Sequence, residues 1–454
     1  MDCRMSFESL LAKAESSMSN PKLNSIYDGD LQLEQIGVSI PPQVRALEMR
    51  WNVPRLAVDV LAEALNIDGF EGAAVDDDVL RRLRLAWSGL HMDALAQQAH
   101  TEALVQGEAF LVVGPSDNAH GVMTTVHSRD GVAVEQTWDG QIEEAVVTFQ
   151  SKNDNWSDVV RAVHYMPGGI DVYQKTSGLW GLIDSFEWVG RVPVIPLRNV
   201  SRVGDRHGRS DMDLVIDYGN AGSRTFTLLQ LATEMLSLPQ KYILGGDRER
   251  MRREDGTKIS LDDLKLGSLL LTPSADSKVG QLPGADLNQI TLVIKSLAQQ
   301  VSAMTGIPPQ ALGLESANPA SAEAMRVAKD RLISRGEKKQ AIFSSAWEEW
   351  AKVVCAFWGV DLEGAGLSPV WRDIASPSAS AKAQALLQAH AQGVVSARTA
   401  RDGLQLTPEQ AQRENAREDA SYAVGSRGVV IDSVDDGGVA EPAGDGGDSV
   451  SEDA

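Results

Sequence analysis

The amino-acid sequence predicts an α+β protein in which long helices are separated along the chain from a β-rich region. Apolar residues at helical spacing fill much of residues 42–106, and strand-like runs with Gly-containing turns fill residues 108–199. Helical patterns return from about residue 210 and include a very regular one that begins near residue 285. Strands and helices that are segregated along a chain are typical of this class.

The composition disfavours several classes of function. The 454 residues include 42 Lys and Arg against 63 Asp and Glu, which gives a formal net charge of -21. A protein that grips nucleic acid by neutralising phosphates needs a local excess of Lys and Arg, and this balance argues against it. No apolar run approaches the roughly 18 residues that span a bilayer, and the N-terminus is not a secretory pattern. We therefore expect no membrane partner and synthesis inside a cell, and the length predicts two to four domains.

The strand-like runs predict an antiparallel meander. They read EAFLVVG, GVMTTVHS, GVAVEQTW, IEEAVVTF, VVRAVHYM and IDVYQK. Gly-containing dipeptides suited to tight turns, such as Asp130-Gly131 and Gly168-Gly169, separate several of them. The meander ends in GRVPVIPLRN, where Pro193 and Pro196 indicate an edge strand because proline cannot donate to a sheet ladder.

A helix is predicted from Ser210 to Leu238. Ser210 with Asp213 resembles a capping box at its start, and Pro239 closes the pattern. Residues 245–284 are then turn-rich and charged, which indicates a small excursion with a few strands.

The next helix carries apolar residues spaced alternately by three and four positions. This seam consists of Leu287, Ile290, Ile294, Leu297, Val301 and Met304. Asp286 suits the start of the helix, and Gly306 before two prolines suits its end. A strict seam favours packing against one or two helices, either of an adjacent subunit or within the core of the same subunit.

A longer helix is predicted after a loop of small and turn-forming residues. Asn318-Pro319 provides a cap and a first-turn proline, and apolar residues then recur as far as Gly359. The polar stretch SRGEKKQ interrupts them, which makes Gly336 a predicted kink or hinge. Short helices are expected over residues 378–424. Residues 432–454 hold eight acidic residues and no Lys or Arg, which predicts a disordered tail.

Recognisable motifs for enzymatic chemistry are missing from the sequence. It contains no phosphate-binding loop, no dinucleotide-binding glycine motif, no HExxH and no GxSxG. Cys3 and Cys355, the two cysteines, can form neither a disulfide framework nor a zinc site. We therefore expect a protein that is not an enzyme, with no catalytic, cofactor-binding or metal-binding residue.

One carboxylate cluster leaves an alternative open. Asp211, Asp213 and Asp217 lie close together, the last two one helical turn apart, and such carboxylates can hold Mg²⁺ for phosphodiester cleavage. The simpler interpretation is that Ser210 and Asp213 cap a helix while the other charges are solvated. A metal-dependent nuclease is the alternative function that this cluster would support.

An ordered series of motifs resembles the portal proteins of tailed bacteriophages, in particular those of long-tailed phages of Gram-positive hosts. The opening helices of that family resemble MRWNVPRLAVDVLAEALNIDGF, and the entry to its β-rich wing resembles AHTEALVQGEAFLVVG. Its Pro-containing strand and first stem helix are similar to VGRVPVIPLRN and GRSDMDLVIDYGNAGSRTFTLLQLATEMLSLPQKYILGG. Its second stem helix, channel loop and long wing helix are similar to VSAMTGIPPQALGLESANPASAEAMRVAKDRL. At Ala322 many relatives have Gly, so the junction between loop and helix is expected to be stiffer here.

The resemblance implies a portal-type fold with a β-rich wing, long stem and wing helices, a small clip and a helical crown. The segments it implies are an N-terminal segment at 1–30, the wing at 31–217, stem helices at 218–244 and 285–304, the clip at 245–284, the tunnel loop at 305–320, the long wing helix at 321–360, the crown at 361–425 and the acidic tail at 426–454.

The resemblance also implies the partners and the location of the protein. Portal proteins form rings, usually dodecamers, at one capsid vertex, and DNA passes through the channel during packaging and ejection. The implied partners are further copies of the chain, the terminase large subunit, a head-completion adaptor, the major capsid and scaffolding proteins, and double-stranded DNA that passes without sequence specificity. No cofactor is implied, and the chain is expected in the virion after assembly in the host cytoplasm.

Two groups of residues are expected to act in these roles. The tunnel-loop residues expected to face DNA are Gly313, Leu314, Glu315, Ser316, Ala317 and Asn318. The clip residues expected to dock partners are Arg248, Arg250, Arg252 and Arg253, although a solvated loop explains them equally well. A helical adaptor that binds another protein without forming a ring remains the second alternative.

Overall fold

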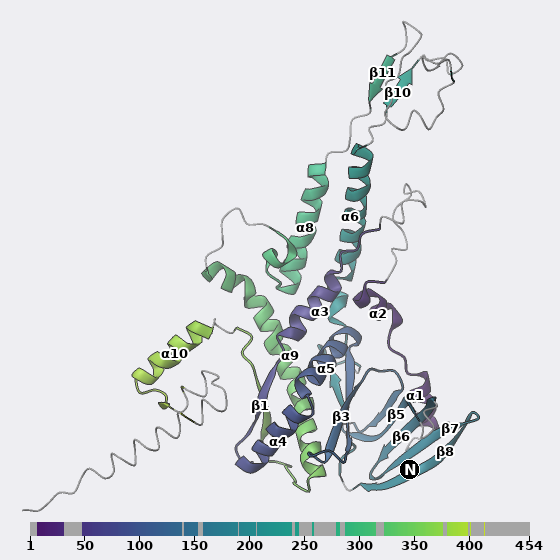
Figure 1. Cartoon of the computed structure of the whole chain (residues 1–454), viewed down its shortest axis with the longest axis vertical. Coiled ribbons are helices and arrows are strands. Elements are labelled where there is room, and N and C mark those ends of the chain that lie inside the picture. Colours follow the sequence, from purple (N-terminus) through teal and green to yellow (C-terminus); the bar gives the residue numbers. More distant parts are fainter. Residues whose placement is uncertain are drawn as a thin grey trace, which may run out of the picture. The chain divides into compact units, whose positions relative to one another are not determined.

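The computed structural model divides into two compact units, Met1–Ala375 and Ser376–Ala454 (Figure 1). The residues that the structure describes are 7–30, 48–138, 140–152, 158–188, 190–205, 207–237, 241–244, 257, 278–281, 287–314, 322–375, 379–397, 400 and 413. The second unit contains α10 (Ala379–Ala391). All other elements discussed below belong to the first unit.

The first unit opens with helices whose ends follow local capping rules. α2 (Pro21–Asp28) and α3 (Val53–Glu63) each follow an Asn that accepts a backbone N–H bond, and each has a proline in its first turn. The predicted helical region over 78–106 is two helices, α4 (Asp77–Gly89) and α5 (Met92–Gln106). They are separate because the chain turns at His91, which has a left-handed backbone with φ 54°.

The β-rich region forms two antiparallel sheets rather than one continuous meander. Strands β4 to β8 follow one another in a five-stranded sheet, which confirms the predicted meander for this part of the chain. Their bounds are β4 (Val132–Gln136), β5 (Ile142–Lys152), β6 (Asp158–Met166), β7 (Gly168–Thr176) and β8 (Leu179–Trp188). The strand β8, which the sequence did not predict, lies at the edge of the sheet, and its side chains are largely exposed.

The second sheet has the order β3-β2-β9 and lies between the meander and the helices. Its strands are β2 (Glu108–Pro115), β3 (Val122–His127) and β9 (Val194–Arg198). β9 is an edge strand, as its prolines predicted, and Pro196 pairs with Phe110 of β2. β2 is the central strand and is buried on both faces over most of its length, which explains its continuous apolar run.

The N-terminal helix α1 (Phe7–Ser16) is part of the β-rich region and not a separate segment. One face of α1 joins the five-stranded sheet in a buried cluster made of Leu10, Leu11, Ala14, Ala133, Val146 and Ala162. The charges mixed into this short helix hid its apolar face from the sequence analysis.

Two helices lie side by side and antiparallel at one end of the first unit (Figure 1). The first, α6 (Ile216–Ser237), follows a short 3-10 helix, η2 (Asp211–Leu214), so the predicted helix from Ser210 is interrupted at Val215. The second is α8 (Leu287–Thr305). Along the chain between α6 and α8, two short strands, β10 (Lys241–Leu244) and β11 (Lys278–Gln281), pair with each other. Most of the predicted clip lies outside the described residues.

The longest helix, α9 (Ala322–Phe357), runs into the centre of the main core. Its side chains Phe343, Trp347 and Trp350 are fully buried. Trp87 of α4 packs edge-on against both tryptophans, with ring centroids 5.4 and 5.3 Å away. These aromatic contacts fix α9 against the opening helices.

The helix α9 continues through Gly336 without a break. A Cβ atom at this position would lie 2.3 Å from Cδ1 of Ile374. The glycine therefore admits the close approach of Ile374 to α9, which is a different role from the predicted hinge.

The expected helical crown does not begin at residue 361. β12 (Leu367–Trp371) pairs antiparallel with β1 (Ile67–Gly72), and both strands belong to the first unit. Neither strand was predicted, because their pairing joins segments about 300 residues apart and leaves no local pattern in the sequence. The helical part of this region starts at Ala379.

The buried His100 predicts an acid-sensitive core. Its ring is fully buried and accepts a hydrogen bond from Nε1–H of Trp347 at 3.0 Å, and burial lowers the pKa of His100 to about 3. The unfolded chain takes up this proton near pH 6.5 and the folded chain only near pH 3, so protonation favours unfolding between these values.

We expect His100→Gln to flatten the loss of unfolding free energy between pH 6.5 and pH 4 by up to about 1.4 kcal/mol per pH unit. Urea unfolding followed by tryptophan fluorescence at several pH values would measure this. The exposed His91, changed to Asn, is the control and should follow the wild type. Identical pH dependence of the wild type and the His100 variant would contradict the prediction.

Candidate functional site at the base of the paired helices

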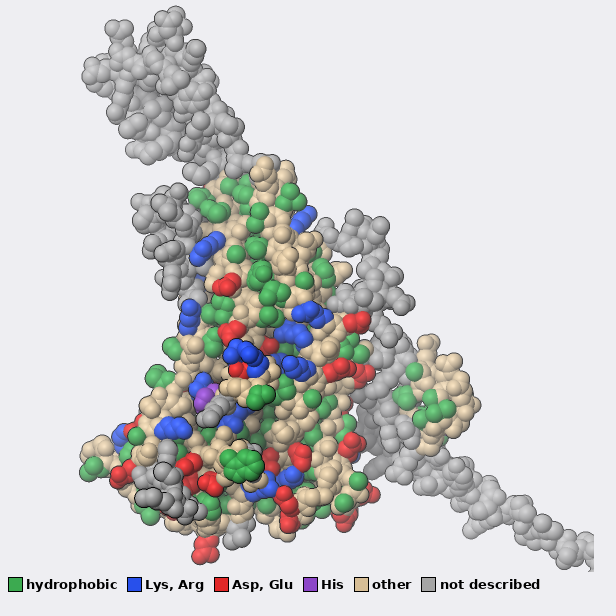
Figure 2. All heavy atoms as spheres, turned by 180° about the vertical axis from the view of Figure 1, so that it is seen from behind, with side chains coloured by type: hydrophobic (Ala, Val, Ile, Leu, Met, Phe, Trp, Pro, Cys, Tyr) green, Lys and Arg blue, Asp and Glu red, His purple; other side chains and the backbone are tan. Residues whose placement is uncertain are grey.

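The paired helices α6 and α8 carry very few charges for exposed helices. α8 has one charged residue, Lys295, and α6 has Asp217, Arg224 and Glu234. Figure 2 shows hydrophobic side chains along the helical part of the visible face, whereas acidic side chains lie mostly in the lower half. Among the side chains of these helices whose exposure the structure describes, the exposed large apolar ones are Leu228, Leu292 and Val293, which are 44%, 64% and 49% exposed. An exposed apolar surface of this kind is typical of an interaction site.

The predicted seam residues lie on the less exposed face of α8. Val301 is fully buried in a cluster with Val53, Ala57 and Val215 of the same chain, and the other five seam residues are partly buried. α8 packs against α6 along its length. At least part of the seam therefore packs against residues of the same subunit. The exposed apolar residues are not members of the seam.

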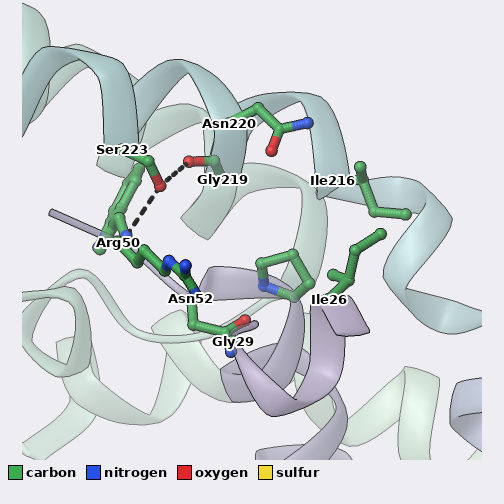
Figure 3. A pocket seen from close by; sticks show the side chains of 10 residues that line it. Ile26, Gly29, Arg50, Asn52, Ile216, Gly219, Asn220 and Ser223 are labelled. Atoms are coloured by element: carbon green, nitrogen blue, oxygen red, sulfur yellow. Dashed lines mark hydrogen bonds between the residues drawn. The ribbon is translucent and has the colours of Figure 1, made fainter. Parts of the chain in front are cut away.

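A segment before α3 packs closely along α6. The backbone N–H of Trp51 donates to Oγ of Ser223 at 2.9 Å, and that of Met49 donates to Oγ1 of Thr227 at 3.0 Å. A Cβ atom on Gly222 would lie 1.9 Å from the ring of Trp51, so only glycine admits this approach. Beside the contact is a small pocket whose lining includes Ile26, Asn52 and Asn220 (Figure 3).

A charged junction lies where η2, α8 and α9 meet. Its centre is Asp211, which binds Nζ of Lys339 at 2.6 Å and Nη2 of Arg335 at 3.2 Å. Nδ2 of Asn199, just after β9, donates to the same carboxylate at 2.9 Å, and Lys339 also donates to Oδ1 of Asn199. The Lys339 side chain is 6% exposed, and this burial lowers the pKa of Lys339 although Asp211 opposes the shift.

The three aspartates of the predicted cluster have different surroundings in the structure. Asp211 is occupied by two cations, and both Asp213 and Asp217 are exposed. Partial desolvation raises the pKa of Asp213 from its ordinary value, an effect that Arg209 opposes. Ser210 caps η2 by accepting from the N–H of Met212, which confirms the predicted cap with a different partner. Across the residues that the structure describes, no three His, Cys, Asp or Glu side chains are grouped to hold a metal ion.

Two arginines of α9 hold the end of α8. Nη1 of Arg335 donates to the carbonyl of Thr305 at 2.6 Å, and Nε of Arg331 donates to the carbonyl of Met304 at 3.3 Å. Cations at a helix C-terminus satisfy its free carbonyls and complement its dipole. Gly306, with φ 78°, ends the helix, and a Cβ there would lie 2.5 Å from the backbone N of Leu332.

Of the tunnel-loop and clip residues predicted to face DNA or dock partners, the structure describes only Gly313 and Leu314. The segment after α8 forms η3 (Pro309–Leu312), and Gly313 and Leu314 follow it. The other tunnel-loop residues, Glu315, Ser316, Ala317 and Asn318, lie outside the described residues, as do the clip residues Arg248, Arg250, Arg252 and Arg253.

Three residues of the junction, Arg335, Lys339 and Asn199, were not among the predicted functional residues. A signal was present, because Arg335 and Lys339 are four residues apart in the stretch that interrupts the apolar stripe of α9. Their partner Asp211 is 124 residues from Arg335, and nothing local identifies it.

None of the helices that the structure describes is both long and apolar enough to cross a membrane.

The glycine contact predicts an exception to helix propensity. Alanine is favoured over glycine by about 1 kcal/mol inside a helix. We nevertheless expect Gly222→Ala to lower the unfolding free energy by about 1–3 kcal/mol, because its Cβ overlaps the Trp51 ring. Urea unfolding of a double-mutant cycle with Trp51→Leu tests this, since the penalty should shrink once the tryptophan ring is gone. A stabilising effect of the glycine substitution would contradict the overlap.

The junction predicts opposite outcomes for two nearby aspartates. Asp211→Asn should cost about 3–5 kcal/mol of unfolding free energy, because it leaves Lys339 buried beside Arg335 without a carboxylate. Asp213→Asn is the matched control, exposed and two residues away, and should stay within about 0.5 kcal/mol of wild type. Chemical unfolding measures both, and equal effects would rule out a dominant role for Asp211.

Comparison with known proteins finds relatives that match nearly the whole chain. The chain is 29% identical over 455 residues to the portal protein of Mycobacterium phage D29, covering 94% of this chain and 91% of that protein. It is likewise 29% identical over 454 residues to the portal protein of Mycobacterium phage L5, covering 94% and 90%. A chain in the neck of an empty gene transfer agent particle superposes with a TM-score of 0.45 at 14% identity, covering 88% of this chain and 100% of that one.

A family model covers most of the chain. The family described as "Phage portal protein, SPP1 Gp6-like" matches residues 19–424, a span that includes both sheets, the paired helices, the charged junction and α9. This chain therefore belongs to the SPP1 Gp6-like family of phage portal proteins.

Proposed function

We propose that copies of this chain close into a ring of about twelve subunits at one capsid vertex, and that double-stranded DNA passes through its channel during packaging and ejection. In this assembly α6 and α8 form the stem, residues 245–284 the clip and residues 305–320 the tunnel loop. The protein then resides in the virion after assembly in the host cytoplasm. Its role is structural, and the work of packaging comes from a separate motor.

The apolar surface of the paired helices carries this proposal. Leu228, Leu292 and Val293 are exposed on helices that have few charges to keep them soluble. Full burial of one such side chain contributes about 1.5–3 kcal/mol. A head-to-tail interface between stems buries this surface in every copy, and it closes into a ring when the rotation between neighbours allows.

The charge of the chain suits a conduit. The formal net charge is -21, and α6 and α8 contribute only Arg224 and Lys295 as cations. A channel that bound phosphates tightly would retain its cargo, because each neutralised phosphate adds to the affinity. A wall with so few cations instead lets the polyanion slide without sequence preference.

The partners follow from the segments. We assign docking of the terminase large subunit, and later of the head-completion adaptor, to the clip and its residues Arg248, Arg250, Arg252 and Arg253. The tunnel-loop residues Gly313 to Asn318 face the DNA. The major capsid and scaffolding proteins are further partners in this proposal.

Electron microscopy of the purified protein in negative stain, with mass from light scattering, tests the assembly. Rings of about twelve subunits with a central hole are the expected result. A uniform monomer, with and without scaffolding protein, would refute the ring and favour an adaptor that binds a partner through its helices.

A charge on the stem should prevent ring closure. We expect Leu292→Asp to shift the mass to that of a monomer, because closure would bury an unpaired carboxylate at each interface. Val203→Asp alters a fully exposed apolar residue on the loop after β9 and should leave the rings intact. Circular dichroism checks that both variants are folded. Rings of unchanged mass for the Leu292 variant would place the subunit interface elsewhere.

A further inference from the structure

The chain leaves α8 through a turn that is held from outside the helix. Gly306 takes a left-handed backbone, and its N–H donates to the carbonyl of Ser302 at 2.8 Å. The carbonyl of the preceding Thr305 accepts a hydrogen bond from Nη1 of Arg335 at 2.6 Å. Among the described contacts, this is the shortest one between α9 and the end of α8. The direction of the following residues is thus set by α9 as well as by α8.

Arg335 has a second partner on a third element. Its Nη2 donates to Oδ1 of Asp211 at 3.2 Å, and Asp211 lies on η2 at the start of α6. One planar guanidinium therefore joins the end of α8 to the root of α6, and its side chain is only 18% exposed. Lysine has no fork and cannot reproduce this geometry.

The junction holds more positive than negative charge, so the C-terminal end of α8 contributes to its stability. Asp211 supplies one negative charge, whereas Arg335 and Lys339 supply two positive charges. The carbonyl of Thr305 lies at the C-terminus of α8, where the helix carries partial negative charge, and it accepts a hydrogen bond from Arg335, one of these two cations. If the end of α8 moved away, Arg335 would lose this partner beside a buried lysine.

We propose that Arg335 is a positioning residue that fixes the direction in which the chain leaves α8, and so sets the placement of residues 306–314. Its consequence for DNA passage rests on the function proposed above, in which these residues open the tunnel loop. The placement itself does not depend on that function and can be measured on the purified protein.

Amide hydrogen exchange of the full-length protein tests the placement. The amides to follow are those of Gly306, which donates to a carbonyl of α8, and of Ala311, Gly313 and Leu314, which donate to carbonyls of residues 308–310. Arg335→Gln should speed their exchange about tenfold or more, because a charge-assisted hydrogen bond is lost. The variant should fold, since Asp211 and Lys339 remain as a balanced pair. Arg335→Lys keeps the charge without the fork and should also speed exchange.

The controls separate a local effect from general destabilisation. Lys338→Gln removes one exposed charge from the same helix and should exchange like the wild type. The amides of Val215 and Gly219, on the α6 side of the junction, should change little. Unchanged exchange at residues 306–314 in Arg335→Gln, or an equal rise at Val215 and Gly219, would overturn the proposal. Wild-type exchange in Arg335→Lys would overturn the role of the fork.

Complementation of a phage that lacks its portal protein with the Arg335→Gln variant, scored by genome packaging, separates the positioning role from the proposed function. Faster exchange together with reduced genome packaging supports both. Faster exchange with normal rings and normal packaging supports the positioning role of Arg335 and counts against a DNA-facing role of residues 305–320. Reduced packaging without any change in exchange overturns the positioning role.

Discussion

The ion-pair junction around Asp211 holds together elements that no local interaction could align. It joins η2 before α6, the end of α8, the middle of α9 and the segment after β9. Burying such charges is costly, and an apolar cluster of the same volume would often stabilise a fold as well or better. Unlike an apolar cluster, the charged groups fix the relative orientation of the elements, because each donor and acceptor has a fixed partner. In this protein the junction therefore specifies how the paired helices leave the body of the first unit.

The sequence predicted features that depend on neighbouring residues. The seam of α8, the meander of β4 to β7, the edge position of β9 and the cap at Ser210 each follow from spacing, turn chemistry or a missing N–H. The predicted end of α9 also agrees closely with the structure, whereas its predicted cap, Asn318, lies outside the described residues. The portal family was recognisable because these local patterns occur in a fixed order.

Features that depend on distant residues could not be predicted. The pairing of β12 with β1 and the packing of α1 on the sheet join segments that are remote in sequence. The carboxylate of Asp211 was visible as a cluster member, yet its role depended on Arg335 and Lys339, which a single sequence does not connect to it. Gly336 was noticed for its conformational freedom, whereas the structure uses its lack of a side chain.

The short ladder between β10 and β11 has a consequence for how such proteins diversify. Four residue pairs, from Lys241 with Gln281 to Leu244 with Lys278, bring the ends of the intervening segment together next to the paired helices. Once the ends are fixed, doubling the length of an insertion costs only about 0.6 kcal/mol in closure entropy. The segment between these strands can therefore be exchanged as a cassette during evolution. In the assembly proposed above, such an exchange would change the partner of the clip while the helices, the junction and the core remain as they are.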